Sequence, residues 1–375
     1  MVNRERMLQE FFELVKIKCS TRDERQVADL VGSRLTALGG EISEDDVGTK
    51  IGGNCGNLFA YFHGTVQGAT RILLSAHLDS VEPCGGIEPK LENGVITSAG
   101  DTILGSDCKA GVAGILEALR IVKENNIPHG DIQVVFTVAE EGGVNGSKNM
   151  DPSRLKADMG FVLDSSGAPG KVIVMAPGQN ALAITVHGKT AHAGIAPEEG
   201  VNAIVVAGKA MAQLKHGRID FETTANIGKI TGGGATNIVT DKVQITAEAR
   251  SRNPQKLADQ TQHMVETFEQ VAAANGARAE VKVVKSYDPF VLTEDMPVIQ
   301  ACKAAAEAIG LTPTLEGTGG GSDANFFNVY GVPSAVLAVG MSKVHTTNEY
   351  IKEEDLYKTA ELTVALIQQA AGRML

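Results

Sequence analysis

The chain has 375 residues, 43% hydrophobic and 21% charged, and its 34 Lys and Arg against 45 Asp and Glu leave a formal net charge of −11 at pH 7. This balance excludes collagen-like, disordered and disulfide-scaffold proteins. An acidic chain without a basic patch repels phosphate backbones, so we expect no nucleic-acid partner.

Cysteine usage and the amino-terminal segment bear on where the protein resides. The five cysteines are scattered and lack the paired spacing of a zinc ribbon or a redox dithiol, which favours a reducing compartment. Residues 1–17 are charged and amphipathic rather than signal-like, and no apolar run approaches the ~20 residues of a membrane span. We expect a cytoplasmic protein that does not enter a membrane.

The first part of the chain reads as alternating helices and strands. Apolar residues at helical spacing predict two opening helices, at 3–18 and 22–38. Short β-rich runs then alternate with helical ones, with strands at 71–79, 133–141 and 159–164 and a helix at 110–125. Strand and helix in alternation predict an α/β domain with a mostly parallel sheet covered on both faces.

The pattern changes near residue 178. A β-α-β-β-α-β series follows, with strands at 181–189, 226–233, 242–251 and 279–287 and helices at 201–214 and 254–276. This order is the split βαβ, ferredoxin-like plan, and its size suits an inserted domain. The α/β pattern returns with a helix from 295, the run PSAVLAVG and a last helix at 353–373. We therefore predict one domain at 1–177 and 290–375, interrupted by a second at 178–289.

Acids and histidines follow the apolar strands of the first domain. The residues concerned are His77, Asp79, Glu140, Glu141, Asp164 and His345, with Asp107 just before a predicted helix. In open α/β sheets the carboxyl ends of the strands border the ligand crevice, so these side chains can converge. So many carboxylates together repel one another unless cations are present, which favours one or two divalent metals over the alternative that each acid only caps a strand or helix end. Imidazole and carboxylate ligands suit zinc, and also manganese or cobalt.

Seven segments together resemble the M20 metallopeptidases, and most of all peptidase T and its relatives. They are AHLDSVEP, GSDCKAGVAGILEAL, AEEGGVNGS, VLDSSG, HGKTAHAG, GGGSDANFF and VHTTNEY, in the family's order over nearly the whole chain. The resemblance implies a zinc-exopeptidase-like catalytic domain holding two zinc ions, with an inserted lid or dimerisation domain.

The resemblance also assigns roles to the acids and histidines. It implies that Asp107 bridges the two metals, with His77 and Asp164 completing one site and Glu141 and His345 the other. Glu140 becomes the general base, and a cis peptide bond follows Asp107. Asp79 is expected to accept the second ring N–H of His77 and fix its tautomer rather than to bind metal. Cys108 stands where many relatives carry a second Asp, and we expect a buried, inert thiol there rather than one that coordinates or oxidises.

The inserted domain supplies the residues expected to meet the substrate. The resemblance suggests that His192 reaches the neighbouring subunit's site to stabilise the oxyanion, which requires a homodimer, and that Asn237 and Arg250 bind substrate. The guanidinium of Arg250 matches a peptide carboxylate. In the run 317–323 the glycines, Gly320 among them, expose backbone N–H groups that suit a peptide carboxylate or carbonyl, whereas the run lacks the ending of a phosphate loop. Ser322 is expected to cap the helix that follows.

With the family resemblance, the leading hypothesis is a two-metal aminopeptidase acting on short peptides, and the likeness to peptidase T suggests tripeptides. The alternatives within the family are an N-acyl-amino-acid amidohydrolase and a carboxypeptidase. The alternative outside enzymes is a catalytically inactive peptide-binding or metal-binding module.

Overall fold

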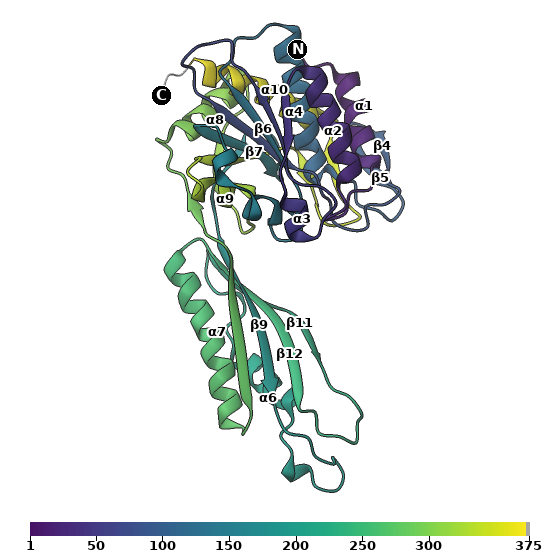
Figure 1. Cartoon of the computed structure of the whole chain (residues 1–375), viewed down its shortest axis with the longest axis vertical. Helices are drawn as coiled ribbons and strands as arrows, with labels where there is room; N and C mark the ends of the chain where they lie inside the picture. The colour runs from purple at the N-terminus through teal and green to yellow at the C-terminus, as the bar shows by residue number, and fades with distance from the viewer. Residues whose placement is uncertain (373–375) are drawn as a thin grey trace. The chain divides into compact units, whose positions relative to one another are not determined.

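In the computed structural model, which describes residues 1–372, the chain forms two compact units. Unit 1 comprises Met1–Met175, Val291–Gly317 and the segment from Ser322 onward, and unit 2 comprises Ala176–Phe290 and Thr318–Gly321. The first and last parts of the described chain, purple and yellow in Figure 1, belong to unit 1, and the teal and green middle forms unit 2. The four residues Thr318–Gly321 pack with unit 2, although the sequence places them far from its other segment.

Unit 1 is built on a large mixed sheet. Among the described residues it has nine strands in the order β1-β2-β6-β3-β7-β16-β8-β14, with β15 added beside β8. The four central strands β6, β3, β7 and β16 run parallel, and β2 and β8 pair antiparallel on either side of them. The strands are β1 (Glu41–Glu44), β2 (Leu58–Phe62), β3 (Ile72–His77), β6 (Ile132–Thr137), β7 (Met159–Ser165), β8 (Lys171–Ala176), β14 (Phe290–Val291), β15 (Thr314–Gly317) and β16 (Ser334–Ala338).

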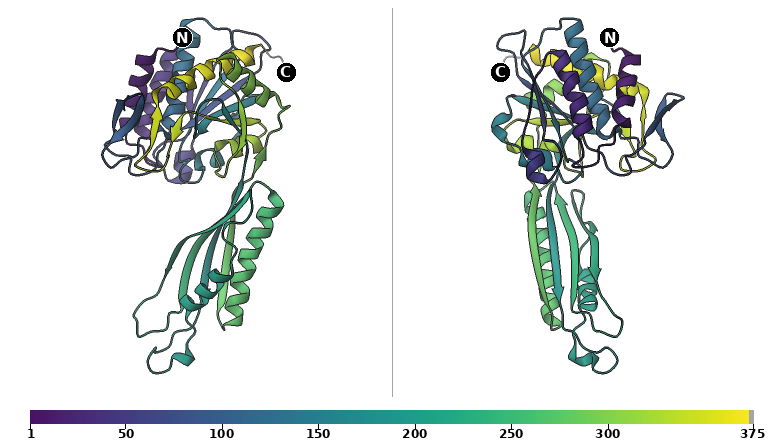
Figure 2. Two further views of the ribbon diagram at one scale, coloured as in Figure 1. Left: turned by 180° about the vertical axis from the view of Figure 1, so that it is seen from behind. Right: turned by 45° about the vertical axis from the view of Figure 1, so that its right-hand side comes forward.

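Every residue of β3 and of β6 is buried, because helices cover both faces of the sheet. Helix α4 packs on β3 and β7, α10 packs on α4 and α8, and α9 packs on β7 and β16. Figure 2 shows this unit from two further sides. The helices are α1 (Arg4–Lys16), α2 (Arg25–Leu38), α3 (Val47–Ile51), α4 (Ser106–Glu124), α5 (Asn145–Asn149), η1 (Pro152–Arg154), α8 (Pro297–Ala308), α9 (Asp323–Val329) and α10 (Glu353–Ala371).

A smaller antiparallel sheet completes unit 1. Its strands in order are β17 (Met341–Ser342), β18 (Tyr350–Lys352), β5 (Val95–Ala99) and β4 (Glu88–Glu92). The short loop between β17 and β18 carries His345, so this sheet brings a carboxy-terminal segment beside residues from the first third of the chain.

Unit 2 is a five-stranded antiparallel sheet with two helices on one face. The strands lie in the order β10-β11-β12-β9-β13, and α6 and α7 pack on each other and on β9 and β12. The elements are β9 (Gly178–His187), η2 (Pro197–Glu199), α6 (Ala203–Gln213), β10 (Gly217–Arg218), β11 (Thr223–Gly232), β12 (Lys242–Ser251), α7 (Pro254–Ala274) and β13 (Arg278–Tyr287). The buried residues of β12 alternate with exposed ones, as expected of a strand with one face in the core.

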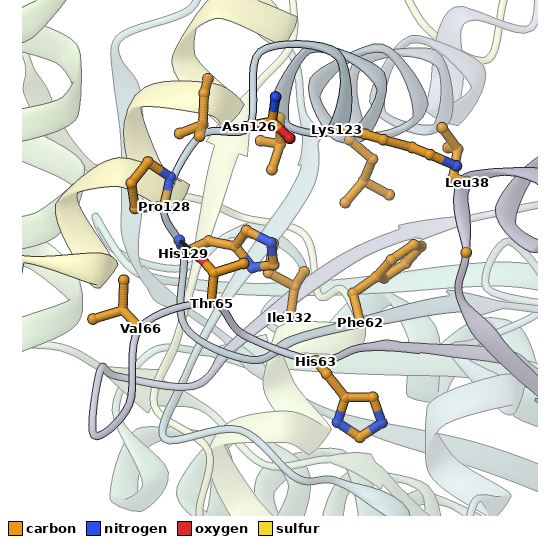
Figure 3. A pocket seen from close by; sticks show the side chains of 14 residues that line it. Leu38, Phe62, His63, Thr65, Val66, Lys123, Asn126, Pro128, His129 and Ile132 are labelled. Atoms are coloured by element: carbon orange, nitrogen blue, oxygen red, sulfur yellow. Dashed lines mark hydrogen bonds between the residues drawn. The ribbon is translucent and has the colours of Figure 1, made fainter.

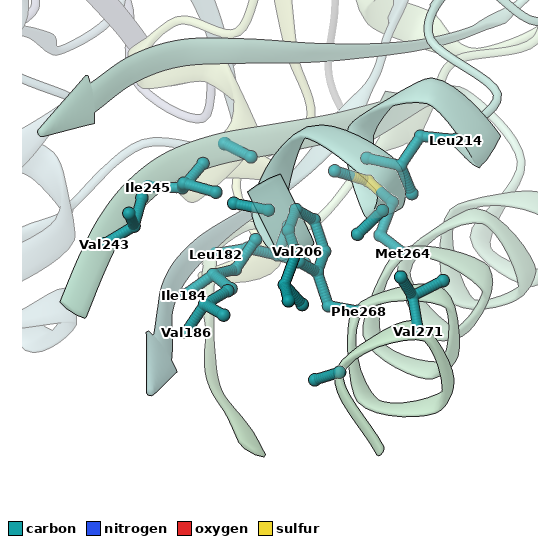
Figure 4. Close-up of a cluster of buried hydrophobic side chains, with 14 of the residues drawn as sticks. Leu182, Ile184, Val186, Val206, Leu214, Val243, Ile245, Met264, Phe268 and Val271 are labelled. Atoms are coloured by element: carbon teal, nitrogen blue, oxygen red, sulfur yellow. The ribbon is translucent and has the colours of Figure 1, made fainter. Parts of the chain in front are cut away.

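The core of unit 2 lies between this sheet and its helices. Strand residues such as Leu182, Ile184 and Ile245 meet Val206 from α6 and Phe268 from α7, and all five are buried (Figure 4). Both helices begin at an asparagine whose side chain accepts from the first free amides, Asn202 for α6 and Asn253 for α7. The β-α-β-β-α-β order predicted from the sequence is therefore present, with the short β10 added.

The predicted fold class, a mostly parallel catalytic α/β domain with an inserted α+β domain, is confirmed. The sequence analysis missed several strands, among them β1, β2, β8 and the β4–β5 hairpin. The last predicted helix is present up to Ala371, and its end at 373 lies outside the described residues. No helix in the described part of the chain has the length and hydropathy to cross a membrane.

Candidate metal centre

Five side chains predicted as metal ligands meet at the carboxyl ends of the parallel strands of unit 1. His77 is the last residue of β3, Asp164 lies near the end of β7, and Glu141 follows β6 by four residues. Asp107 lies at the kinked start of α4, and His345 lies between β17 and β18. The strand-end rule therefore correctly brought together residues up to 268 positions apart.

The five residues form two groups that share one carboxylate. In the first, His77 Nε2 lies 3.0 Å from Asp107 Oδ1 and 3.5 Å from Asp164 Oδ1. In the second, His345 Nε2 lies 3.3 Å from Asp107 Oδ2 and 3.0 Å from Glu141 Oε2. Within each group the potential ligand atoms all lie within 4.8 Å of one another. Asp107 thus presents one oxygen to each group, which is the arrangement a bridging carboxylate needs.

The backbone and the thiol beside Asp107 agree with expectation. The Asp107–Cys108 peptide bond is cis, as the family resemblance implied. The Cys108 thiol is fully buried, and its Sγ donates to the carbonyl oxygen of Leu163 at 2.8 Å. Burial raises the pKa of this thiol well above its usual range. Cys108 is nevertheless close enough to count with His77, Asp107 and Asp164 as a potential donor.

Two acids of this centre, Asp164 and Glu140, bind their protons more tightly than isolated acids do. Burial raises the pKa of Asp164 to about 7 and that of Glu140 well above its usual range. Burial alone would raise the pKa of Asp107 too, but hydrogen bonds from His345 and His77 hold it below its usual range. Asp164 and Glu140 are therefore not stable as anions beside the charged Asp107 unless positive charge is close by.

The two histidines supply the missing positive charge in this structure. Hydrogen bonds to Asp107 and Glu141 raise the pKa of His345 to about 10. Burial would lower the pKa of His77, but the charge of Asp164 and the hydrogen bond to Asp107 raise it above its usual range. Imidazole nitrogens and carboxylate oxygens are the donors that divalent zinc, manganese and cobalt accept. The charge and donor chemistry of the centre therefore fit two divalent cations that share Asp107.

Asp79 is fully buried beside His77 and organises the centre through its backbone and its side chain. His77 Nδ1 lies 3.0 Å from the Asp79 carbonyl oxygen and 3.5 Å from its carboxylate, so the main chain is the nearer acceptor. The buried ammonium of Lys109 donates to the same carbonyl at 3.3 Å and to Ser80 Oγ at 2.8 Å. The carboxylate of Asp79 accepts from Thr21 Oγ1 at 2.8 Å.

Four consecutive backbone amides after β6 donate to side chains from three distant segments. Val138 N donates to Asn57 Oδ1 at 3.1 Å, and Ala139 N donates to Glu24 Oε1 at 3.0 Å. Glu140 N and Glu141 N donate to the two oxygens of Asp79, at 2.9 and 3.2 Å. Ala139 adopts a φ of 51°, a value that L residues rarely take. These acceptors hold the turn that carries Glu140 and Glu141.

A further buried acid, Asp323, lies near Glu140 at the start of α9. Its Oδ2 accepts from Thr137 Oγ1 at 2.5 Å, its Oδ1 is buried without a hydrogen bond, and burial raises its pKa. Ser322 is the N-cap residue of this helix, as predicted, and its amide donates to Asn325 Oδ1 at 3.0 Å.

The predicted substrate residues lie in unit 2. His192 and Asn237 are exposed and occupy neighbouring loops, which are joined by hydrogen bonds from Ala193 N to the Asn237 oxygen and from Val239 N to the Ala191 oxygen, each 2.9 Å. The geometry therefore brings these two predicted residues together.

Arg250 and Gly320 occupy another part of the same unit. Arg250, on β12, donates from Nε and Nη2 to the carboxylate of Glu248 at 2.9 and 3.1 Å. These two guanidinium nitrogens therefore already have a carboxylate partner within the chain. Gly320 N donates to Thr318 Oγ1 at 3.2 Å. A Cβ at Gly321 would lie 2.4 Å from the ring of Tyr287, which requires glycine where this segment packs on unit 2.

A separate pocket of about 730 Å³ in unit 1 contains none of the predicted site residues (Figure 3). It is lined by apolar side chains including Phe62, Val66 and Ile132, with polar ones at its edge. Two of the polar groups have partners of their own, since Lys123 Nζ donates to the Ala37 oxygen at 2.9 Å and His63 lies 3.0 Å from Glu41. We assign no role to this pocket.

Sequence reasoning missed the buried groups that support the ligands, chiefly Glu24, Asn57, Asp323 and Glu349. Asp323 and Glu349 lie in the segments GGGSDANFF and VHTTNEY that carried the resemblance. Each could therefore have been identified from the sequence as an acid in a family motif. Glu24 and Asn57 had no such signal, because their contacts join segments far apart in the sequence.

A protein-family model and a relative of known sequence both match most of this chain. The model of peptidase family M20/M25/M40 matches residues 73–369. The uncharacterized protein YqjE of Bacillus subtilis is 45% identical over 371 residues, which cover 99% of this chain and all of the relative.

Two solved structures are similar over their whole length. The aminopeptidase PepT from Bacillus cereus has 46% identity and a TM-score of 0.91, with 99% of each chain covered. A tripeptidase from Staphylococcus aureus has 40% identity and a TM-score of 0.95, with both chains covered in full.

Proposed function

Because the chain belongs to peptidase family M20/M25/M40, we propose that it is a two-metal exopeptidase that removes the amino-terminal residue from short peptides. Membership makes the chain a hydrolase and confirms the resemblance seen in the sequence. The observation that carries the finer proposal is the pair of donor groups sharing Asp107, one oxygen of which faces each group.

We assign the ligands as the sequence analysis did. His77 and Asp164 would hold one ion, Glu141 and His345 would hold the other, and both sites would share Asp107. When bound, two divalent ions, zinc or in its place manganese or cobalt, would polarise the scissile carbonyl and lower the pKa of a water molecule.

Glu140 is the general base of the proposed reaction. Its carboxylate accepts a proton from water as the water oxygen bonds to the carbonyl carbon, and it then delivers that proton to the amine nitrogen as the C–N bond breaks. Two features support this role: Glu140 adjoins the ligand Glu141, and burial raises its pKa, which favours a group that must hold a proton between the two steps. Asp79 supports the base by accepting from the backbone amides of both glutamates.

Short peptides are the proposed substrates. Two relatives at 46% and 40% identity are described as an aminopeptidase and a tripeptidase, which favours this activity over acyl-amino-acid or carboxy-terminal hydrolysis. Arg250 is the proposed partner of the peptide carboxylate once Glu248 releases its guanidinium, and Asn237 and the amide of Gly320 contribute further polar contacts.

We also propose a homodimer in which His192 serves the partner's site by stabilising the oxyanion. Support comes from apolar residues exposed on unit 2: Ile204 and Val205 on α6 are 44% and 52% exposed, and Ile230 on β11 is 49% exposed. Ile230 pairs with the buried Ile245, so it points to the helix side of the sheet. Uncovered apolar side chains on one side of a domain are typical of an interface.

A reducing, cytoplasmic location remains our proposal for the protein. All five cysteines are buried and free of disulfide bonds in the part of the chain that the structure describes.

The experiment that tests the function compares wild type with Glu140→Gln in the presence of added metal. Wild type should cleave a free tripeptide but not its N-acetylated form, which separates an aminopeptidase from the acyl-hydrolase and carboxypeptidase alternatives. Glu140→Gln should lose turnover by at least about 100-fold, the scale of a general base, while metal analysis still finds about two ions per chain. Undiminished turnover would remove Glu140 from its role, and no hydrolysis by wild type would favour a binding module.

A further inference from the structure

Glu349 is a buried glutamate outside the proposed ligand set that contacts the segment carrying Asp107. It follows His345 by four residues in the loop between β17 and β18, and it is only 2% exposed. Its own amide donates to the Thr346 oxygen at 3.1 Å, which closes the turn that begins just after His345. A shift of the Glu349 side chain would therefore also move the loop that carries His345.

Four donors on consecutive residues converge on this carboxylate. Leu104 N and Gly105 N each donate to Oε2 at 2.9 Å. Ser106 Oγ donates to Oε1 at 2.6 Å, and Asp107 N donates to the same oxygen at 3.1 Å. Both oxygens are thus engaged, and all four donors belong to residues 104–107.

This segment needs acceptors because its backbone is not regular. Gly105 has a φ of 74°, and Asp107 has φ −85° and ψ 103°, so the amides here have no carbonyl of a preceding helical turn to meet. None of the ion pairs among residues 1–372 includes Glu349, so these donors are its electrostatic partners. A carboxylate that accepts several N–H and O–H groups is well suited to a buried turn.

We propose that Glu349 is a positioning residue that holds Asp107 in register with His345. It joins the two loops that supply these groups, so that the two oxygens of Asp107 face His77 on one side and His345 on the other. The inference rests on the proposed function only in taking Asp107 and His345 as metal ligands.

Replacing Glu349 with Gln keeps the shape of the side chain and removes one acceptor oxygen. Whichever oxygen becomes the amide nitrogen, two of the four donors then face an N–H₂ group. The 104–107 segment should shift, and Asp107 should no longer meet both histidines. Loss of an outer partner of a metal ligand typically weakens metal affinity by about 10–100-fold, and we expect a change of that size for Glu349→Gln.

The experiment uses the full chain, stripped of metal and titrated with Zn²⁺ alone against a chromophoric chelator, and a separate measurement of kcat and KM on a free tripeptide. Glu117→Gln is the matched control, because Glu117 is also fully buried and accepts from a backbone amide, that of Asn3, at 3.0 Å, together with Arg6. The control should lower thermal stability and leave zinc affinity within about two-fold of wild type. Glu349→Gln should weaken zinc binding and lower kcat, with KM within about two-fold of wild type.

A milder variant covers the case in which Glu349→Gln does not fold. Ser106→Ala removes a single donor to Glu349 and should weaken zinc binding by about two- to ten-fold, less than the full change. Zinc affinity equal to wild type in the folded Glu349→Gln variant, or in Ser106→Ala if the first does not fold, overturns the proposal. If wild type binds zinc but cleaves no peptide, the proposed peptidase function fails, whereas the zinc titration still decides the role of Glu349.

Discussion

Glu24 is a buried glutamate whose two carboxylate oxygens have different surroundings. Its Oε1 accepts from Arg22 N at 2.7 Å and from Ala139 N at 3.0 Å, while its Oε2 is buried without a hydrogen bond. Burial raises the pKa of Glu24 to about 7, and the charge of Asp79 adds to this effect. A neutral side chain at this position is therefore compatible with the turn before Glu140.

The raised pKa makes stability depend on pH. In the window from about 4.5 to 7 the folded chain binds the proton of Glu24 more tightly than the unfolded chain, so the free energy of unfolding falls as the pH rises through it. Glu24→Gln keeps an oxygen for both amides and carries no charge. We expect the variant to match wild type at pH 4, below this window, and to be more stable by about 1–3 kcal/mol at pH 8. Urea unfolding at the two pH values measures this, and a difference that does not change with pH would contradict it.

Helix α4 approaches β7 closely because of Gly111. A Cβ at this position would lie 2.2 Å from the Leu163 oxygen and 3.1 Å from Cys108 Sγ. The start of α4 and the end of β7 carry Asp107 and Asp164, so this close contact sets the distance between the elements that hold two of the proposed ligands.

In Gly111→Ala, the destabilisation caused by the added methyl group should therefore exceed any stabilisation from higher helix propensity. We expect Gly111→Ala to lower the free energy of unfolding by about 1–3 kcal/mol, the scale of overpacking a core. Gly32, in α2, is the matched control: its Cβ would make only ordinary contacts with Leu58, at 3.7 and 3.9 Å. Gly32→Ala should raise stability by about 0.5–1 kcal/mol through helix propensity. Denaturant unfolding of both variants measures the contrast, and equal shifts of the same sign would show that the contact with β7 is loose.

In the whole molecule, the proposed ligands come from segments spread over most of unit 1. His77, Asp107, Asp164 and His345 belong to separate elements or loops, so metal binding should link them. Because a ligand that binds only the folded state stabilises it, Zn²⁺ at about 100 times its Kd should add roughly 2.7 kcal/mol. Melting of the stripped protein with and without Zn²⁺ measures this. Asp107→Ala should lose most of the gain, and an equal gain in that variant would speak against a shared carboxylate.

Dimerisation is the second property of the whole molecule. Val205→Glu places a charge beside Ile204 on α6, and we expect it to convert a dimer into a monomer as measured by light scattering after gel filtration. If His192 acts in the partner's site, the monomer should lose most of its tripeptidase activity while unit 1 keeps its zinc affinity. A Val283→Glu variant serves as control, because Val283 is 41% exposed on β13, at the opposite edge of the sheet from β11. A fully active Val205→Glu monomer would exclude a role in trans for His192.

The fold was predicted from two kinds of sequence pattern, helical periodicity and apolar runs. Long periodic segments such as 254–276 and strongly apolar runs such as 71–79 were recognised correctly, because burial imposes a clear period or composition on them. The strands β1 and β8 were missed. β1 is a four-residue edge strand with no buried residue, whereas β8 lies inside the sheet but pairs with β16, a strand far away in the sequence. The site followed from strand ends and family motifs, while its supports at Glu24 and Asn57 did not.

By itself the sequence determined the order of the elements and the chemical type of the centre. Histidines and acids stand directly after apolar strands, and parallel strands end on one side of a sheet. Only the tertiary structure decided that Asp107 offers a separate oxygen to each histidine, that Asp79 meets His77 more closely through its carbonyl than through its carboxylate, and that Glu349 holds the turn before Asp107. These are contacts between segments as far as 245 residues apart, and their geometry depends on how the strands and helices pack rather than on any local pattern.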